Sequence, residues 1–339
     1  MATTKTPPKT AIKKTNTSAA ARPAAKPVVK AAAKPIVKTA ANAKQGNGVH
    51  KPELNVNERI KVLKTYKIYI GGQFPRTESG RYYPLTLADG DIVNMCLSSR
   101  KDFRNAVVKA REAQEKWEGK SALNRSQILY RIAEMLETRS SQFIDELVQQ
   151  GSSRSAAKQE VEQSIDRLIY YAGWCDKYNQ VFSTVNPVSS SHFNFSSTEA
   201  MGVVAMVVSQ NSGLLGLVSA VAPVIAGGNT CVVLASYLKP LCAVTFAEVL
   251  NSSDVPGGVV NILTGESKEL LAQFATHMDV NAIYVCTSNN ADKKPIETNA
   301  ALNVKRARVE EEQNWSDAKQ ESPYKIMDYL EVKTTWHPI

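Results

Sequence analysis

Four short, almost continuous runs of apolar residues dominate the second half of the chain. They are MGVVAMVV at residues 201–208, NTCVVL at 229–234, GVVNIL at 258–263 and NAIYVC at 281–286. Runs of this kind are typical of parallel strands that are buried on both faces. Stretches with helical periodicity alternate with them, at residues 213–225, 241–250 and 268–277. Because βαβ crossovers are right-handed, this alternation predicts an α/β fold with a doubly wound parallel sheet.

A helical block and a β-hairpin are expected before the sheet. Ser99 and Asp102 have the spacing of a capping box, which predicts a helix start. Later helices are predicted from the apolar stripe at 128–136, the stop at Gly151 and the periodicity of 155–174. Upstream, YKIYIGGQFPRTESGRYYPL at residues 66–85 predicts a hairpin, with YKIYI as its first strand and a second strand after the Ser-Gly turn.

The positive charge of the chain is concentrated at its N-terminus. The 339 residues carry a formal charge of +9, yet residues 1–52 hold eleven Lys and Arg and no Asp or Glu, so the remainder is close to neutral. These residues are rich in Ala, Thr and Pro and contain the octads AAKPVVKA and AAKPIVKT. Such a composition predicts a disordered tail. Three roles stay open for it: contact with a polyanion, a solvated spacer, or a targeting segment.

Cysteine and histidine spacing argues against a disulfide framework or a metal site. The five cysteines are scattered without CxxC spacing, and none of the four histidines pairs with another His or Cys at ligand spacing. Reduced thiols are typical of a cytoplasmic protein. No apolar run is long enough to cross a membrane, so no membrane contact is expected.

A set of short motifs resembles the nucleotide-binding half of the aldehyde dehydrogenase superfamily. The segments YIGGQF at 69–74 and IDRLIYYAGWCDKY at 165–178 look like early parts of that family. The later motifs follow in the family's order and spacing: Gly202-Val203-Val204, Gln210-Asn211, Ala222-Pro223, Gly228-Asn229-Thr230, Pro240-Leu241, PGGVVN at 256–261 and Thr264-Gly265. The likeness extends over residues 66–310.

The resemblance implies a particular chemistry. Members of this family oxidise aldehydes with NAD or NADP, through a cysteine nucleophile, an asparagine that holds the oxyanion and a glutamate base. The family asparagine falls on Asn211, and the glutamate falls near Glu310. Asn211 has a second interpretation, as the N-cap of a helix that starts near Gly213. Both residues are therefore read as vestigial catalytic positions.

Several expected cofactor ligands are replaced. By the resemblance, Leu234 stands where the family has a ribose-binding lysine, and Tyr237 stands where it has a glutamate. Thr287, with Ser288 and Asn289, replaces the Gly-Ser-Thr turn that admits the pyrophosphate. No cofactor is therefore expected, although Ser236 and the backbone amides leave loose nucleotide binding open.

The family's catalytic domain has no counterpart in the sequence. Residues 311–321 form a short linker where that domain would begin, and none of the five cysteines lies at a nucleophile position. Residues 322–339 resemble the terminal family segment, in which EVKTTW predicts an edge strand. That strand is expected to join the hairpin in a sheet for oligomerisation. The alternative is that it only covers the chain's own core.

These observations divide the chain into a tail at residues 1–52, a nucleotide-binding-type domain at 53–310, a linker at 311–321 and a C-terminal strand at 322–339. The resulting hypothesis is an inactive scaffold or regulatory subunit that associates with itself or with a full-length aldehyde dehydrogenase. One alternative is an NAD(P)-dependent oxidoreductase that acts on aldehydes through an unrecognised nucleophile. Another is association with nucleic acid through the tail.

Overall fold

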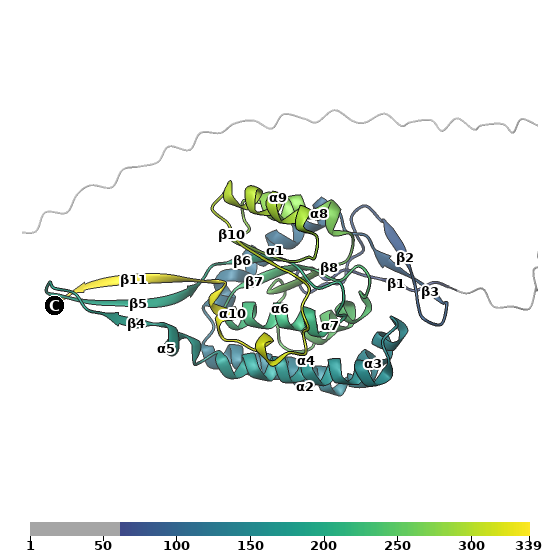
Figure 1. The fold of residues 1–339 in the computed structure, drawn as a ribbon, viewed down its shortest axis with the longest axis horizontal. Helices are drawn as coiled ribbons and strands as arrows, with labels where there is room; N and C mark the ends of the chain where they lie inside the picture. Colours follow the sequence, from purple (N-terminus) through teal and green to yellow (C-terminus); the bar gives the residue numbers. More distant parts are fainter. Residues whose placement is uncertain (1–61) are drawn as a thin grey trace, which may run out of the picture. The chain divides into compact units, whose positions relative to one another are not determined.

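A five-stranded parallel sheet forms the centre of the computed structural model, which describes residues 62–339. The strand order is β10-β9-β6-β7-β8. The strands are β6 (Val203–Val207), β7 (Thr230–Leu234), β8 (Val260–Leu263), β9 (Ala282–Cys286) and β10 (Arg306–Glu310). Every residue of the first four is buried, as their apolar runs require, and the predicted α/β fold is confirmed (Figure 1). β10 lies at an edge and is only partly buried.

Helices cover both faces of this sheet. The core on one face contains residues of three helices, α1 (Arg100–Glu118), α8 (Ser267–Thr276) and α9 (Asn290–Ala301). The other face packs against α6 (Leu215–Ala226) and α7 (Leu241–Asn251), and behind these lie α2 (Ala122–Thr138), α3 (Ser140–Gln149) and α4 (Arg154–Trp174). The short α5 (Tyr178–Phe182) follows α4. Because successive side chains of a strand point to opposite faces of the sheet, each strand supplies one row of side chains to each core.

The helix boundaries predicted in the N-terminal block are confirmed. Ser99 accepts a hydrogen bond from the Asp102 amide while the Asp102 carboxylate accepts one from the Ser99 amide, which is a capping box. Gly151 follows α3 in the left-handed region, with φ of 93°, a conformation that costs glycine little.

The predicted hairpin at residues 66–85 is wrong in its pairing. The antiparallel hairpin is instead made by β2 (Tyr82–Thr86) and β3 (Ile92–Cys96), and β1 (Thr65–Tyr66) adds to β3 in parallel. The YKIYI run is extended, but Tyr69 exchanges backbone hydrogen bonds of 2.8 Å with Ile262 of β8. Burial of Ile68 and Tyr69 against the main sheet therefore outweighs pairing within the hairpin.

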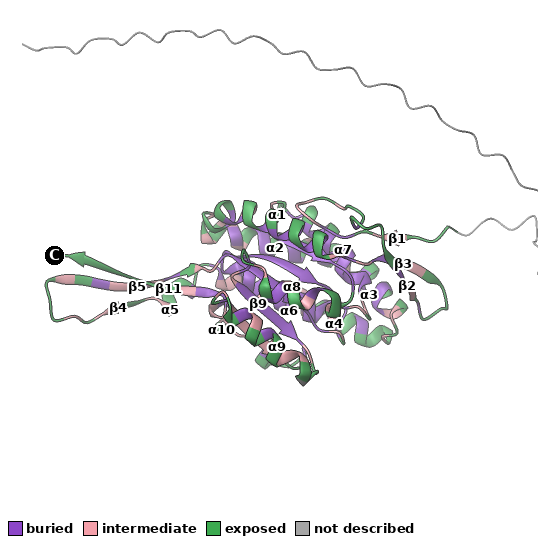
Figure 2. Cartoon of the chain, turned by 90° about the horizontal axis from the view of Figure 1, so that it is seen from above, coloured by how far each residue is buried: buried purple, intermediate pink, exposed green. Residues whose placement is uncertain are grey.

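A separate antiparallel sheet projects from the body as an arm. It consists of β4 (Thr184–Asn186), β5 (His192–Ala200) and β11 (Leu330–Pro338), in the order β11-β5-β4. Figures 1 and 2 show it extending away from the helices, at the end of the molecule opposite β1–β3. The expectation that the C-terminal strand joins the Tyr66 hairpin in one sheet is therefore wrong, because its partner is β5.

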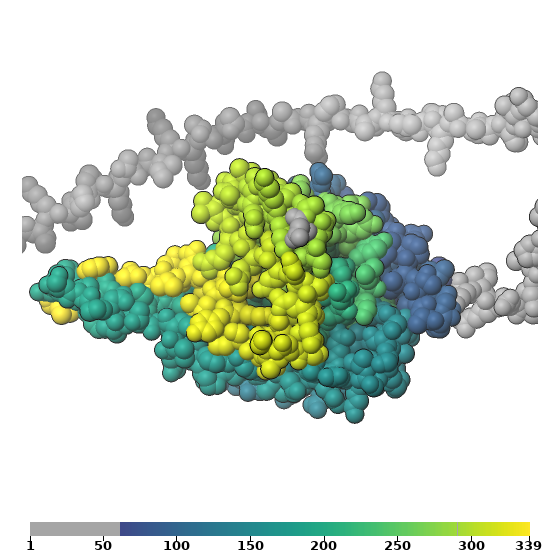
Figure 3. All heavy atoms as spheres, viewed as in Figure 1, coloured from purple at the N-terminus to yellow at the C-terminus, as the bar shows by residue number. Residues whose placement is uncertain are grey.

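The segment between β10 and the arm is folded against the body. It contains one turn of 3-10 helix, η1 (Ala318–Gln320), and the short helix α10 (Tyr324–Met327). In Figure 3 this C-terminal part of the chain lies across one face of the body before it enters the arm. The predicted tail at residues 1–52 lies outside the described residues. Within residues 62–339, no helix has the length and apolarity that a membrane span needs.

Candidate functional site

A cavity of about 300 Å³ opens at the carboxyl ends of β6 and β9. The chain leaves β6 toward β7 on one side, whereas β9 lies on the other side, so this is the point at which the strand order reverses. Ligands of open α/β sheets bind in the crevice at such a point. The cavity has apolar walls from β6, α8 and β9 and a polar rim from the following loops, and its lining residues are Val207, Gln210, Asn211, Ser267, Leu271, Val285, Cys286, Thr287, Ser288, Asn289, Asp292 and Glu312.

Asn211 lies exposed at the rim of this cavity and does not cap a helix. The N-cap of α6 is Leu214, which makes no side-chain cap bond. The Glu160 carboxylate of α4 accepts instead from the amides of Leu214 at 2.9 Å and Leu215 at 3.1 Å, and from the Ser212 hydroxyl at 2.7 Å. The N-cap interpretation of Asn211 is therefore wrong, because a carboxylate from another helix satisfies the first amides.

Glu312 is a site residue that the sequence reasoning missed. One of its carboxylate oxygens accepts from the Gln210 amide and the other from the Ser209 hydroxyl, both at 2.6 Å. These two donors belong to the loop after β6, which would have to supply hydrogen-bond donors to an anion bound in the cavity. The sequence signal is the run of three glutamates at residues 310–312, which begins at the last residue of β10, and the fold decides which of them faces the cavity.

The residues predicted at the end of β7 lie outside the lining of this cavity. Leu234 is buried in the core on the α1 side. The Ser236 hydroxyl donates to the Gln210 carbonyl at 3.1 Å and accepts from the Lys239 amide at 3.0 Å. The Tyr237 ring stacks on Tyr83 with a centroid distance of 4.4 Å. Each of these side chains is committed to packing or to local hydrogen bonds.

Thr287 lines the cavity, and its amide and hydroxyl already form hydrogen bonds within the protein. Its amide donates to the Glu310 carbonyl at 2.9 Å, and its hydroxyl accepts from the Asn289 amide at 3.1 Å. Asn289 caps α9 by accepting from the Ala291 amide. The turn that precedes α9 is thus closed by its own side chains.

Glu310 does not meet Asn211. Its carboxylate accepts from the Tyr284 hydroxyl at 3.3 Å and from the Gln313 amide group at 3.2 Å, and it lines a separate small cavity with Lys325 and Asp328. The two predicted catalytic positions are therefore on different cavities, and the glutamate that shares one with Asn211 is Glu312.

Cys286 is the cysteine that lines the cavity, and all five cysteines are buried. Burial, as the largest cause, and the nearby carboxylate of Glu312 together raise the pKa of the Cys286 thiol to about 12. The thiol is therefore protonated at neutral pH, whereas a nucleophilic cysteine needs an accessible thiolate. Among residues 62–339 there is also no cluster of His, Cys, Asp or Glu that could hold a metal ion.

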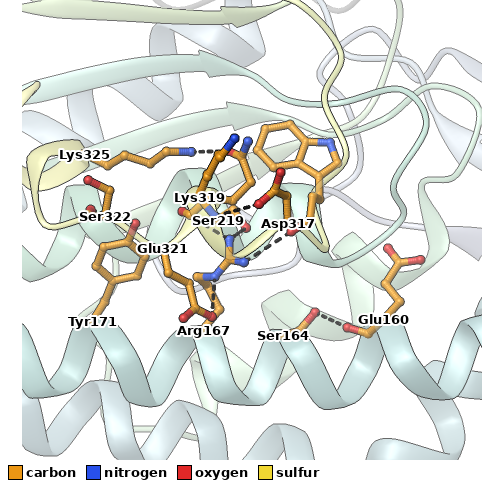
Figure 4. A network of polar contacts seen from close by, with 12 residues as sticks. Glu160, Ser164, Arg167, Tyr171, Ser219, Asp317, Lys319, Glu321, Ser322 and Lys325 are labelled. Atoms are coloured by element: carbon orange, nitrogen blue, oxygen red, sulfur yellow. Dashed lines mark hydrogen bonds and ion pairs between the residues drawn. The ribbon is translucent and has the colours of Figure 1, made fainter.

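Arg167 of α4 anchors residues 315–321 to the body (Figure 4). Its buried guanidinium donates to the carbonyl of Trp315 at 3.2 Å and to that of Gln320 at 3.5 Å. It also donates to the Ser219 hydroxyl at 2.6 Å and pairs with Glu321 at 3.3 Å. The predicted linker is thus a packed segment.

Comparison with known proteins identifies the family. The model of the aldehyde dehydrogenase family matches residues 82–312. Cytosolic 10-formyltetrahydrofolate dehydrogenase of Mus musculus is 30% identical over 260 residues, which are 75% of this chain and 29% of that protein. The putative aldehyde dehydrogenase DhaS of Bacillus subtilis is 29% identical over 265 residues, which are 76% of this chain and 53% of that protein.

Solved structures show the same fold. An aldehyde dehydrogenase from Bacillus cereus in complex with NAD+ superposes with a TM-score of 0.69 at 24% identity, over 73% of this chain and 51% of that one. Aldehyde dehydrogenase C from Pseudomonas syringae, with NAD+ and octanal, gives 0.67 at 27% identity, over 73% and 50%. The matched region spans about half of these structures and of DhaS, and less of the Mus musculus protein. With the family model matched over most of its folded part, this chain belongs to the aldehyde dehydrogenase family.

Proposed function

We propose that this protein is a non-catalytic member of the aldehyde dehydrogenase family, a scaffold or regulatory subunit that associates with itself or with a full-length aldehyde dehydrogenase. The observation that carries the proposal is the state of the cavity at β6 and β9. Its cysteine is a buried thiol, and Glu312, which lines the cavity from the segment after β10, is a carboxylate that is already hydrogen-bonded.

The absence of a thiolate argues against acyl chemistry. Aldehyde oxidation of this family begins with attack of a thiolate on the carbonyl, and a pKa near 12 leaves the Cys286 thiol protonated at pH 7. Asn211 could donate to an oxyanion only if that attack created one. The oxidoreductase alternative therefore requires Cys286 to become exposed and deprotonated, against both burial and the charge of Glu312.

The charge of the cavity argues against a dinucleotide. Family members use NAD or NADP, but two carboxylates, Asp292 and Glu312, line this cavity and no Lys or Arg does. Glu312 also occupies the Gln210 amide and the Ser209 hydroxyl, which are donors that a phosphate would need. The residues present do not fit the cofactor, and we propose that none is bound.

The packed segment 311–321 supports a stable fold without a catalytic domain. In place of the family's large insertion, this chain closes the distance from β10 to the arm with a short segment held by Arg167. The exposed arm then remains for association. We also propose a cytoplasmic location, on the basis of the unpaired cysteines, and polyanion contact through residues 1–52.

Two measurements test the proposal. With a panel of short and aromatic aldehydes and NAD+ or NADP+, the full chain should form no reduced cofactor above a protein-free control. Turnover that disappears in Cys286→Ser would establish the oxidoreductase alternative instead.

Calorimetry tests the affinity for the cofactor separately. NAD+ should bind no tighter than about millimolar, and the double variant Asp292→Asn/Glu312→Gln should gain at least about tenfold, because it removes two repulsive charges. Micromolar binding by the wild type, or no gain in the variant, would contradict the electrostatic argument. A folded state that is unchanged by circular dichroism is the control.

A further inference from the structure

The cavity at the carboxyl ends of β6 and β9 is bordered by loops whose main-chain donors are already used. In the loop after β6, the Gln210 amide donates to the Glu312 carboxylate at 2.6 Å. In the turn before α9, the Thr287 amide donates to the Glu310 carbonyl at 2.9 Å, and the Asn289 amide donates to the Thr287 hydroxyl at 3.1 Å. A ligand that needs amide donors therefore finds these three engaged within the protein.

Hydrogen-bond acceptors, by contrast, remain available among the lining residues. One oxygen of Asp292 accepts from the Asn289 side-chain amide at 3.1 Å, and its other oxygen has no partner among residues 62–339. Glu312 accepts from the Gln210 amide and the Ser209 hydroxyl, but a carboxylate has about four acceptor positions. The side-chain carbonyl of Asn211, exposed at the rim, also accepts no hydrogen bond within the described residues. A ligand that fits this cavity must therefore supply donors.

The charge of the lining favours a cation. Asp292 and Glu312 contribute two carboxylates, and none of the described residues that line the cavity is Lys or Arg. Lys293 follows Asp292 in α9, but its ammonium pairs with Glu311 at 2.9 Å and not with either of these carboxylates. Because no opposite charge faces them across the cavity, the two carboxylates attract a positively charged ligand.

The lining suits an organic cation better than a metal ion. Calcium and magnesium take about six or more oxygen ligands in a compact shell, and the described part of the chain has no group of three or more His, Cys, Asp or Glu that could hold a metal ion. The same cavity has an apolar wall of Val207, Leu271 and Val285. Such a wall offers nothing to a metal ion, but it covers the hydrocarbon part of a small molecule.

We propose that this cavity binds a primary alkylammonium through the carboxylates of Asp292 and Glu312, with the alkyl chain on the apolar wall. An ammonium has three N–H donors and no acceptor, which matches a lining that offers acceptors. A guanidinium fits less well, because its planar fork needs two free oxygens on one carboxylate and neither carboxylate has two. The inference rests on the proposed function, since a crevice that holds no dinucleotide is free for another ligand.

Titration with butylammonium tests the inference, with 1-butanol as the neutral molecule of the same chain length. Ligand-observed NMR on the full chain at low salt should give a dissociation constant of about millimolar for butylammonium, which is the range expected of so small a ligand. Butanol should bind at least about tenfold more weakly, because it makes no charge-assisted hydrogen bond to a carboxylate. Similar affinities for the two molecules would contradict the role of the carboxylates.

Two variants separate the charge of the cavity from its volume. The double variant Asp292→Asn/Glu312→Gln keeps the volume and should weaken butylammonium binding at least about tenfold while it leaves butanol binding unchanged. Leu271→Trp keeps both carboxylates and should weaken butylammonium binding at least about tenfold, because the indole takes the space of the alkyl chain. The matched control is Glu297→Gln, exposed on the same helix α9, which should change the affinity less than about twofold. Circular dichroism shows whether each variant folds.

The outcomes separate this inference from the proposed function. No saturable binding of butylammonium, or a loss in Glu297→Gln equal to that in the double variant, would contradict the inference and leave the proposed function standing. Binding that survives in folded Leu271→Trp would place the amine outside the cavity and also contradict the inference. Aldehyde turnover or micromolar NAD+ binding would instead contradict the proposed function, whatever the amine does. The double variant should bind NAD+ more tightly and butylammonium more weakly, and a loss of both would contradict the charge argument.

Discussion

Glu146 of α3 is a buried carboxylic acid that faces α7. One of its oxygens accepts from the Thr245 hydroxyl at 2.6 Å, and the other has no hydrogen-bond partner. Desolvation by burial raises the pKa of Glu146 above its ordinary value. The native state therefore favours the protonated acid. This contribution to stability is complete below the unfolded-state pKa and is lost as pH rises through the folded-state pKa.

Replacement of Glu146 by glutamine should therefore stabilise the protein at neutral pH. We expect Glu146→Gln to raise the free energy of unfolding by about 1 kcal/mol at pH 8, with a difference that becomes smaller as the pH falls and the wild-type carboxylate is protonated. Denaturant unfolding at several pH values measures this. The exposed Glu137→Gln is the control and should show no such trend. A difference that grows toward low pH would contradict the assignment.

Val304 stands in the left-handed region, with φ of 56°, and its side chain is 93% exposed. A β-branched residue in this conformation is strained, and no burial compensates for it here. We expect Val304→Gly to stabilise the fold by about 1 kcal/mol. Leu302→Gly, at a nearby exposed position with φ of −61°, should be neutral or destabilising. Thermal melting of both variants gives the comparison, and equal shifts would exclude backbone strain as the cause.

The sequence motifs predict the position of Asn211, but they do not predict which glutamate lines the same cavity. The motif order located Asn211 at the end of a strand, and the structure places it at the rim of the cavity. Glu310 and Glu312 are indistinguishable in the sequence, because both belong to one run of three glutamates at the end of the same strand. Only the path of the chain after Glu310 decides which carboxylate turns toward β6. The same reasoning explains why Glu160 was missed as the partner of the α6 amides: it lies more than 50 residues away in α4.

At the scale of elements, buried strands were predictable and polar ones were not. β6, β7, β8 and β9 are continuous apolar runs, so their sequence contains the signal. β5 has the sequence HFNFSSTEA, and its inner positions hold Asn194, Ser196 and Thr198. Ser196 bonds the Thr334 hydroxyl across the sheet at 2.8 Å. A strand that is stabilised by such polar pairs has no hydrophobic alternation to detect.

The packed segment 315–321 depends on Arg167. Removal of this guanidinium leaves the buried carbonyls of Trp315 and Gln320 without their donor. We expect Arg167→Met to lower the free energy of unfolding by about 2–4 kcal/mol and to increase hydrogen exchange in this segment. Glu321→Gln, which keeps those carbonyl contacts, should cost less than about 1 kcal/mol, because Glu321 is partly exposed. Equal losses in both variants would mean that the ion pair, and not the carbonyl contacts, holds the segment.

For the whole molecule, the order of strands and helices could be predicted while their contacts across the chain could not. The apolar runs and right-handed crossovers are local or general properties, and they led to the parallel sheet. The pairing of β11 with β5 joins residues that are at least 130 positions apart, and the docking of Tyr69 on Ile262 joins residues almost 200 positions apart. Neither pairing has a local signal in the sequence. The predicted partner of the C-terminal strand, the hairpin at residues 66–85, is therefore wrong.

The basic N-terminus gives the last prediction. Deletion of residues 1–51 removes eleven positive charges and changes the formal charge from +9 to −2. If these lysines act through phosphate neutralisation, the full chain should bind a polyanion column with a strong salt dependence, and the deleted chain should pass through it. The melting temperature should stay the same, because the cores of the described part consist of residues after 62. Replacement of the eleven basic residues by glutamine is the matched control for length, and it should also abolish retention. Retention of the deleted chain would place the anion-binding surface on the folded body, and a large drop in melting temperature would mean that these residues contribute to the fold.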